Sequence, residues 1–230
     1  MKKTISNMFE KIILVIVATV IIPGFSAFDN KYTVVHDQDN IQQSLNPKGW
    51  FLGGTQPDQY KAGIDTKIVQ HGQQSAILES IVENPSGFCT LMQGCTRKDL
   101  NGKRIKMTGY IKSLNTNIAT MWVRVDDLAG KVTADFDNMM DRPVSGTSDW
   151  TKCEIVFDAT LKCSINYGFI LSGAGKIWVD NLSFEIVDYS MTKTAQYLDA
   201  PFPEEYIQQI EKLPQELPEK PSVNLDFEDN

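Results

Sequence analysis

Three chemically distinct side chains share one face of a strand-like stretch. Within Met121–Asp126, Trp122, Arg124 and Asp126 alternate with apolar residues, and alternate residues of a strand point to opposite sides of a sheet. An indole offers a flat apolar surface to a sugar ring, while a guanidinium and a carboxylate bind its hydroxyl groups. The pattern favours a ligand platform on an open sheet face. The alternative is a tryptophan that covers the sheet beneath a loop.

A second polar group follows directly along the chain. The stretch Asp135–Arg142 packs three aspartates, an amide and a guanidinium into eight residues. Asp137, Asn138 and Arg142 are the candidate ligand-binding residues, because such groups bind vicinal hydroxyls or coordinate calcium through oxygen. The stretch lacks the spacing and the glycine of an EF-hand loop. A turn that is hydrogen-bonded to itself is the alternative interpretation.

Motifs of common enzyme classes are missing from the sequence. It contains no Gly-x-Ser-x-Gly elbow, no His-Glu-x-x-His and no phosphate-binding loop. A glycoside hydrolase needs two carboxylates about 5 to 10 Å apart across a cleft, and Asp126 with Asp137 are the only pair singled out for that role. We therefore expect a non-catalytic protein, with a glycoside hydrolase as the least favoured option.

The surrounding pattern is that of an all-β protein. Short runs with period-two alternation recur at the spacing typical of a sandwich, with Gly, Asn, Pro and Asp in the gaps. A long amphipathic helical pattern is absent from this region, so no helix-turn-helix is expected. The predicted strands are 75–83, 87–93, 105–112, 119–126, 132–137, 151–158, 165–171 and 176–187.

The stretch Ile165–Val187 carries the clearest local signal. Two strand-like runs flank Ser-Gly-Ala-Gly, and the apolar phase of the second run slips at Asp180-Asn181. Such a slip predicts a β-bulge.

Residues 48–188 resemble the galactose-binding-like jelly roll that is common among carbohydrate-binding modules. Similar domains occur in uncharacterised bacterial proteins, including the non-DNA-binding ends of some that are labelled transcriptional regulators. The resemblance implies an antiparallel jelly-roll β-sandwich and, at Asp180 in the closing strand, a structural calcium; no other cofactor is expected. It is carried by Gly49–Gly54, Tyr60, Asp65, Thr90–Gln93, Trp122–Asp126, Asp137–Met139, Asp141–Pro143, Gly146-Thr147, Trp150 and the closing strand.

The two ends of the chain differ from the middle. Residues 1–27 combine lysines near the start, an apolar run and small residues at a cleavage site, which is the pattern of a signal peptide. Residues 28–47 form a polar segment that leads into the sandwich. Residues 189–230 hold five of the ten prolines and nine acidic residues against three lysines. This acidic Pro-rich tail is predicted to be a linker with one short helix at 204–212. Its end, PSVNLDFEDN, either folds back as the first strand, remains from a lost module or belongs to a disordered acidic tail.

Charge and processing restrict the partners. The leader holds three lysines and one glutamate, so its removal takes the net charge from −7 to −9. An acidic, exported chain does not suit nucleic acid, and no membrane span is expected after cleavage. Retention of residues 12–28 as an anchor is the alternative. The predicted location is outside the cytoplasm, periplasmic or secreted.

Four cysteines in an exported chain predict disulfide bonding. Cys89 and Cys95, like Cys153 and Cys163, are separated by extended segments that disfavour a local bridge unless a tight turn at Gly94 or near Ala159 brings either pair together. The alternatives are bridges across strands or thiols that stay reduced and buried. We therefore expect at least one disulfide between these two regions. Together the residues predict a non-catalytic binding module for a saccharide or similar polar ligand, and a structural or protein-interaction module is the alternative.

Overall fold

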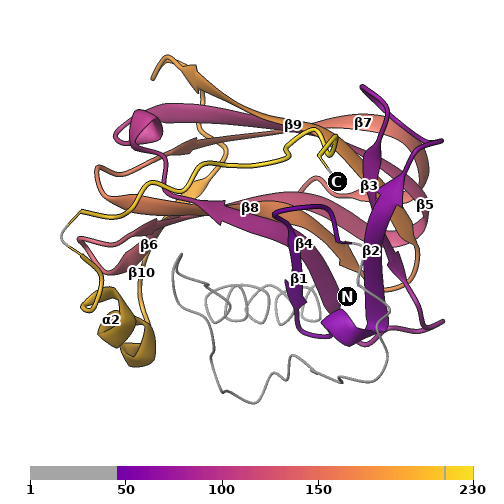
Figure 1. Cartoon of the computed structure of the whole chain (residues 1–230), viewed down its shortest axis with the longest axis horizontal. Coiled ribbons are helices and arrows are strands. Elements are labelled where there is room, and N and C mark those ends of the chain that lie inside the picture. Colours follow the sequence, from indigo (N-terminus) through magenta and orange to yellow (C-terminus); the bar gives the residue numbers. More distant parts are fainter. Residues whose placement is uncertain (1–45, 215, 230) are drawn as a thin grey trace.

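The computed structural model describes residues 46–214 and 216–229, which form two packed antiparallel layers of strands (Figure 1). The predicted leader, and the polar segment up to residue 45, lie outside the described residues. None of the described helices is long and apolar enough to cross a bilayer. The predicted all-β jelly-roll sandwich is confirmed.

Each layer has its own order of strands. One runs β10-β6-β5-β8-β4-β1 and the other β7-β5-β9-β3-β2, so β5 belongs to both. The bounds are β1 Phe51–Gly54, β2 Tyr60–Asp65, β3 Ser75–Ser80, β4 Phe88–Cys95, β5 Arg104–Asp127, β6 Val132–Asp137, β7 Val144–Asp158, β8 Cys163–Ser172, β9 Lys176–Val187 and β10 Gln196–Pro201. Two short 3-10 helices, Pro57–Gln59 and Lys98–Leu100, and one α-helix, α2 (Glu204–Ile210), complete the described elements.

Strand β5 connects the two layers. Its first half, up to Leu114, pairs with β9, and its second half, from Ile118, pairs with β8 and β6, while β7 pairs along it from Arg104 to Ala119. Asn115 lies between the halves with φ 52°, a left-handed conformation that asparagine adopts more readily than most residues. The sequence predicted two strands here. They are one, because the bend occurs without loss of pairing to β7.

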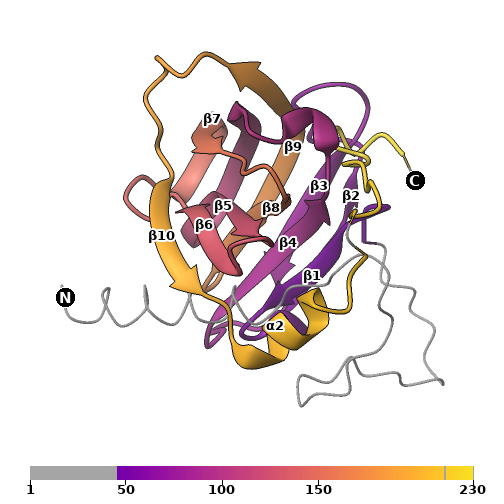
Figure 2. The same cartoon turned by 90° about the vertical axis from the view of Figure 1, so that its left-hand side faces the viewer.

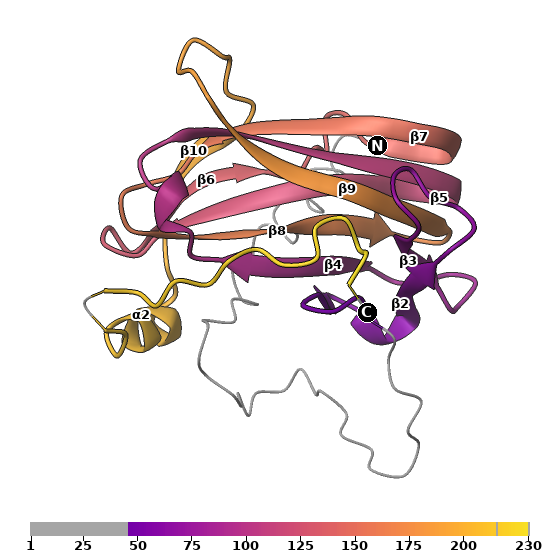
Figure 3. The same cartoon turned by 45° about the horizontal axis from the view of Figure 1, so that its top comes forward.

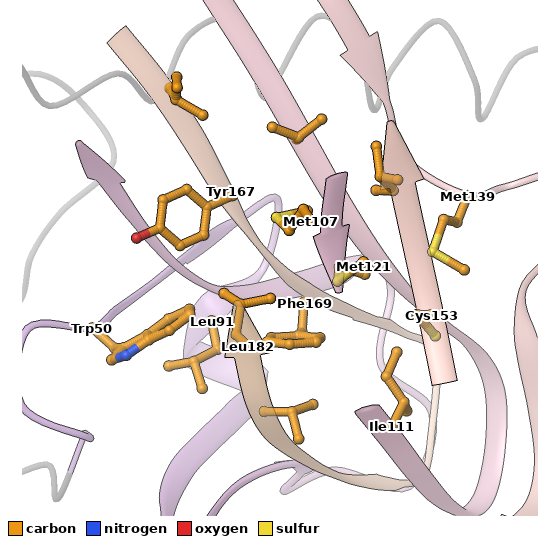
Figure 4. Close-up of a cluster of buried hydrophobic side chains, with 14 of the residues drawn as sticks. Trp50, Leu91, Met107, Ile111, Met121, Met139, Cys153, Tyr167, Phe169 and Leu182 are labelled. Carbon is orange, nitrogen blue, oxygen red and sulfur yellow. The ribbon is translucent and has the colours of Figure 1, made fainter. Parts of the chain in front are cut away.

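The main core fills the space between the layers. Figure 4 shows Trp50, Leu91, Met121, Tyr167 and Phe169 among its buried side chains. These residues come from the inward phase of β4, β5 and β8, together with the residue that precedes β1. Close packing of this kind follows from the period-two alternation that predicted the strands.

The predicted β-bulge in the closing strand is confirmed. Thr108 pairs with Ser183 and Tyr110 with Asp180, so β9 carries one residue more than β5 between these two rungs. Asn181, within the extra length, has φ 50°. The core phase is carried by Ile177 and Val179 before the bulge and resumes at Leu182 after it, and Asp180 belongs to neither set.

The C-terminal segment lies against the sandwich rather than away from it (Figure 2). β10 pairs with β6, and α2 has nearly the bounds predicted for the short helix. Arg104 helps to hold the segment that joins β9 to β10. It makes a two-pronged ion pair with Asp158, with both N–O distances 2.8 Å, and donates to the carbonyls of Tyr189 and Met191.

The final residues run between the edges of the two layers (Figure 3). The side-chain amide of Gln93 in β4 exchanges two hydrogen bonds with the backbone of Val223, and Leu182 in β9 donates its N–H to the carbonyl of Leu225. Phe227 is fully buried, 5.0 Å from Trp50 between ring centroids. The tail end therefore folds back onto the sandwich, as one interpretation of PSVNLDFEDN predicted, but residues 221–229 form no strand.

The cysteine prediction is wrong in this structure. Cys89, Cys95, Cys153 and Cys163 are all free and buried. Burial raises the pKa of Cys89, Cys153 and Cys163 to about 12. They behave as small apolar core residues with unreactive thiols, because each occupies the inward phase of its strand.

Candidate functional site

The hairpin of β5 and β6 places the six candidate ligand residues in two separate groups. Phe136 pairs with Arg124 and Asp137 pairs with Val123, and paired residues share a sheet face. Trp122, Arg124 and Asp126 therefore lie on the outer face, opposite the core, whereas Asp137 lies on the inner side at the sheet edge. Asn138 and Arg142 follow Asp137 in the β6–β7 loop.

Trp122 is buried, contrary to the exposed platform expected from the sequence. The outer face of its sheet carries a second apolar cluster, and the indole packs within it while Nε1 donates to Thr90 Oγ1 at 2.7 Å. The sequence placed Trp122 on the correct face of its strand but wrongly predicted that face to be open. Neighbouring strands also place large apolar side chains on this face and bury the indole. The cluster consists of Phe88, Met92, Trp122, Phe136 and Ile170, with Phe51, Met140 and Leu198 beside it.

Arg124 and Asp126 form the polar end of the same face. The carboxylate accepts hydrogen bonds from Arg124 Nη2 at 2.9 Å, Asn166 Nδ2 at 3.1 Å and Thr133 Oγ1 at 3.3 Å. Both charged side chains are at most 2% exposed. Burial raises the pKa of Asp126, and the Arg124 guanidinium opposes the rise. We call Arg124, Asp126, Asn166 and Thr133 the closed cluster.

The second group is held by the chain itself. The Asp137 carboxylate accepts the backbone N–H of Met139 at 2.8 Å and Arg142 Nη2 at 2.7 Å, and Asn138 Oδ1 accepts the N–H of Met140. These are the self-bonded turns of the alternative interpretation. They also fix Arg142, whose side chain remains 34% exposed.

Arg142 lies at a depression in the surface of about 510 Å³. Its size falls within the range of about 300 to 1,000 Å³ that is usual for small-ligand sites. The β6–β7 loop and the edge strand β7 form it, with hydroxyls of Ser145, Ser148 and Thr151 at its border. We call it the Arg142 depression and define it by Met139, Arg142, Pro143, Val144, Lys152 and Glu154.

Charges of both signs meet in the Arg142 depression. Lys152 Nζ lies 2.7 Å from a Glu154 carboxylate oxygen, and Arg142 Nη1 lies 2.7 Å from Asp141. Arg142 Nε has no hydrogen-bond partner among residues 46–214 and 216–229. The site thus offers a fixed cationic donor, a carboxylate acceptor and hydroxyls above an apolar floor.

The glycosidase pairing of Asp126 with Asp137 does not fit this geometry. The two carboxylates lie on opposite faces of the β5–β6 hairpin. Each is already bound to its own arginine, at 2.9 and 2.7 Å. They cannot act together on one glycosidic bond.

Asp180 is equally unsuited to calcium. Its carboxylate accepts the backbone N–H groups of Gln70, His71 and Asn181 at 2.9, 3.0 and 2.7 Å. Three inward-pointing N–H dipoles favour an anion, whereas calcium needs six to eight oxygen ligands. No group of three or more His, Cys, Asp or Glu side chains suited to a metal occurs among the described residues. The role of Asp180 is to anchor the loop between β2 and β3.

Sequence reasoning missed several members of both groups. Asn166 and Thr133 belong to the closed cluster through strand pairing, which a single sequence does not reveal. Lys152 and Glu154 had a readable signal. They occupy the outward phase of the predicted strand 151–158, whose alternate residues Cys153 to Phe157 belong to the core.

No known family model matches the chain. A curated relative, the uncharacterised HTH-type transcriptional regulator YbfP of Bacillus subtilis (strain 168), is 34% identical over 211 residues, which cover 90% of this chain. The chain spans 65% of the length of that relative. The resemblance to proteins labelled as transcriptional regulators is thereby confirmed. The described residues contain a single α-helix, so they hold no helix-turn-helix.

Solved structures with a similar fold include carbohydrate-binding modules. TmCBM61 in complex with β-1,4-galactotriose aligns with a TM-score of 0.45 and 12% identity, over 62% of this chain and 92% of that one. The CBM22-1 xylan-binding domain of Xyn10C from Paenibacillus barcinonensis aligns with a TM-score of 0.43 and 14% identity, over 61% and 86%. Likenesses this distant carry no argument about function.

Proposed function

We propose that this protein is a non-catalytic binding module for a saccharide or a similar polar ligand, and that the ligand binds in the Arg142 depression. One observation carries the proposal. Arg142, one of the residues singled out from the sequence, lines an accessible hollow of suitable size, and its guanidinium is held there by the buried carboxylate of Asp137. The hollow also adds hydroxyls and a Lys152–Glu154 pair that were not singled out from the sequence.

The chemistry of the hollow suits vicinal hydroxyl groups. A guanidinium fixed by two carboxylates loses little conformational entropy on binding, and its free Nε donates to a ligand oxygen. Glu154 is the matching acceptor for a ligand hydroxyl. Aromatic side chains are absent from the described lining, so recognition would rest on hydrogen bonds rather than on stacking.

The test is a glycan array followed by calorimetric titration with the sugars that bind. Arg142→Ala should weaken binding at least about tenfold, because hydrogen bonds to charged groups contribute about 1.5 to 3 kcal/mol. Arg97→Ala is the matched control, since Arg97 also pairs with an aspartate, Asp99, and is 26% exposed. Equal affinity of the Arg142→Ala protein and the unaltered protein would exclude the depression as the site.

The relative labelled as a regulator favours a second candidate, a protein-interaction module. In that case the sandwich would bind a partner protein. An array on which no glycan binds, together with a stable complex recovered by cross-linking in cells, would favour this function over saccharide binding.

We further infer that the protein works outside the cytoplasm. The inference rests on the leader pattern of residues 1–27 alone. The mature protein should begin within a few residues of Ala27. N-terminal sequencing of protein from the extracytoplasmic fraction tests this, and a chain that begins at Met1 would contradict it.

A further inference from the structure

Two aromatic side chains near the Arg142 depression have polar atoms that no described residue binds. Trp150 of β7 and Tyr110 of β5 are both half-buried. Neither Trp150 Nε1 nor Tyr110 Oη has a hydrogen-bond partner among residues 46–214 and 216–229. Within the same residues, neither ring packs against another aromatic ring or a cation. Both rings are therefore available to a ligand.

The other three tryptophans use their indole N–H groups inside the protein. Each is buried, and a buried tryptophan usually has a partner for its N–H. The bonds run from Trp50 to the Asn224 carbonyl at 3.0 Å, from Trp122 to Thr90 Oγ1 at 2.7 Å and from Trp178 to Asp65 Oδ2 at 2.8 Å. Trp150 differs from them in both its exposure and its free N–H.

Strand pairing places Tyr110 and Trp150 on the same outer face of the second layer. Tyr110 pairs with Lys152, and paired residues share a sheet face. Trp150 lies two residues before Lys152 in β7 and so points to the same side. The opposite phase of both strands belongs to the core, as Ile111 and Cys153 show. The two rings are thus diagonal neighbours on adjacent strands.

This aromatic pair is continuous with the Arg142 depression. Lys152 lines the depression and is also the pairing partner of Tyr110. Glu154 lines the depression on the same phase of β7 as Trp150. The four residues from Trp150 to Glu154 span about 14 Å, at about 3.4 Å per residue of an extended strand. This span is longer than one sugar ring, so a ligand that reaches both ends contains more than one sugar unit.

The charges beside the two rings are already paired. Lys112 Nζ lies 2.7 Å from an Asp149 carboxylate oxygen, and Lys152 Nζ lies 2.7 Å from Glu154. Each lysine is therefore neutralised by a carboxylate that is itself exposed. Such pairs offer donors and acceptors together, which suits the hydroxyls of a neutral sugar, because a hydroxyl both donates and accepts.

We propose that the Arg142 depression continues along β7 onto an aromatic subsite formed by Tyr110 and Trp150, and that the ligand is a neutral oligosaccharide. The inference rests on the proposed function. One sugar unit occupies the depression and a following unit stacks on the Trp150 indole, whose flat apolar surface matches the face of a sugar ring. Trp150 Nε1 and Tyr110 Oη donate to hydroxyls of that second unit. The subsite supplies the stacking that the lining of the depression lacks.

The test compares sugars of different length by NMR titration. Galactose, xylose and glucose are each paired with their linear β-1,4-linked trisaccharide. At least one trisaccharide should bind at least about tenfold more tightly than its monosaccharide, because stacking buries further apolar area. Trp150→Ala should reduce this affinity ratio to about twofold or less, since the stacking surface is lost. Tyr197→Ala, at a tyrosine that is 65% exposed on β10, is the control and should leave the ratio unchanged.

A second measurement needs no destabilising variant. The Trp150 indole N–H signal is identified by its disappearance in Trp150→Phe. In the unaltered protein it should exchange with water faster than the signals of the three buried tryptophans, and the trisaccharide should shift it more than the monosaccharide does. A signal that does not move when the trisaccharide is saturating overturns the aromatic subsite.

Arg142→Ala separates failure of the aromatic subsite from failure of the proposed function. It should weaken the monosaccharide and the trisaccharide alike. If it does so while Trp150→Ala leaves their ratio unchanged, the aromatic subsite alone is overturned. If Trp150→Ala lowers the ratio while Arg142→Ala changes nothing, the subsite stands and the depression is overturned. If no sugar binds, both are overturned.

Discussion

Two arginine–aspartate pairs arise from the same hairpin and differ in almost everything except their chemistry. Arg124 and Asp126 are 2.9 Å apart and fully buried, whereas Arg142 and Asp137 are 2.7 Å apart with the guanidinium one-third exposed. The first pair has additional partners in Asn166 and Thr133. The second faces a hollow in the surface. Residue type and spacing thus predict which groups bind charge, and burial decides whether a ligand reaches them.

The largest expected difference between the pairs is in stability. Asp126→Ala should lower the free energy of unfolding by about 3 to 5 kcal/mol, because it leaves a buried guanidinium without its carboxylate. Asp137→Ala should cost about 1 kcal/mol or less, since its arginine reaches water and also contacts Asp141. Denaturant unfolding of both variants measures the contrast. Similar losses in the two would show that the closed pair is hydrated in solution.

A companion variant removes the closed pair altogether. Arg124→Met with Asp126→Leu should restore most of the stability lost in Asp126→Ala, because apolar replacement of a buried pair is often neutral or favourable. A double variant as unstable as Asp126→Ala would show that lost packing, rather than the loss of the carboxylate beside Arg124, dominates the effect.

The indole beside the closed pair provides the next comparison. Trp122→Ala should cost about 3 to 5 kcal/mol, as expected for a large buried side chain. Trp122→Phe should cost less, because it removes only the hydrogen bond to Thr90 and leaves a smaller cavity. Trp150→Ala is the control at a half-buried tryptophan of β7 and should cost clearly less than Trp122→Ala. If Trp122→Ala unfolds no more easily than Trp150→Ala, the exposed platform expected from the sequence regains support.

A third arginine–aspartate pair predicts a smaller, pH-dependent effect. The Arg104 guanidinium holds the pKa of Asp158 below its ordinary value of 3.8. A carboxyl whose pKa is lowered by folding adds stability above pH 3.8, and this contribution is lost as pH falls toward the folded-state value. Asp158→Asn should therefore flatten the acid limb of a stability–pH curve and leave a modest loss at neutral pH. A limb as steep as that of the unaltered protein would assign the acid sensitivity to other carboxyls.

Much of the architecture was predictable because it follows from local alternation. The bounds predicted for β6 and β9 agree with the structure, and the phase slip at Asp180-Asn181 located the bulge. These features depend on which face of a strand meets the core, and a period of two in the sequence records that directly. The polar turn from Asp137 to Arg142 could also be predicted from the sequence, because its hydrogen bonds join residues that are near neighbours in the chain.

What only the tertiary structure decided depends on contacts between residues far apart in sequence. The apolar cluster around Trp122 comes from four strands, and the cover over Asp126 comes from α2, about 80 residues later in the chain. The tail end closes the sandwich through Phe227 and Trp50, which lie at opposite ends of the described chain. The cysteines remained unpaired because each turned into the core. The sequence by itself determined the strands, their inward faces and the groups able to bind charge. The tertiary structure decided which of those groups meet solvent, through the order of the strands and the segments that cover them. Burial is a property of the assembled layers, so a single strand does not specify it.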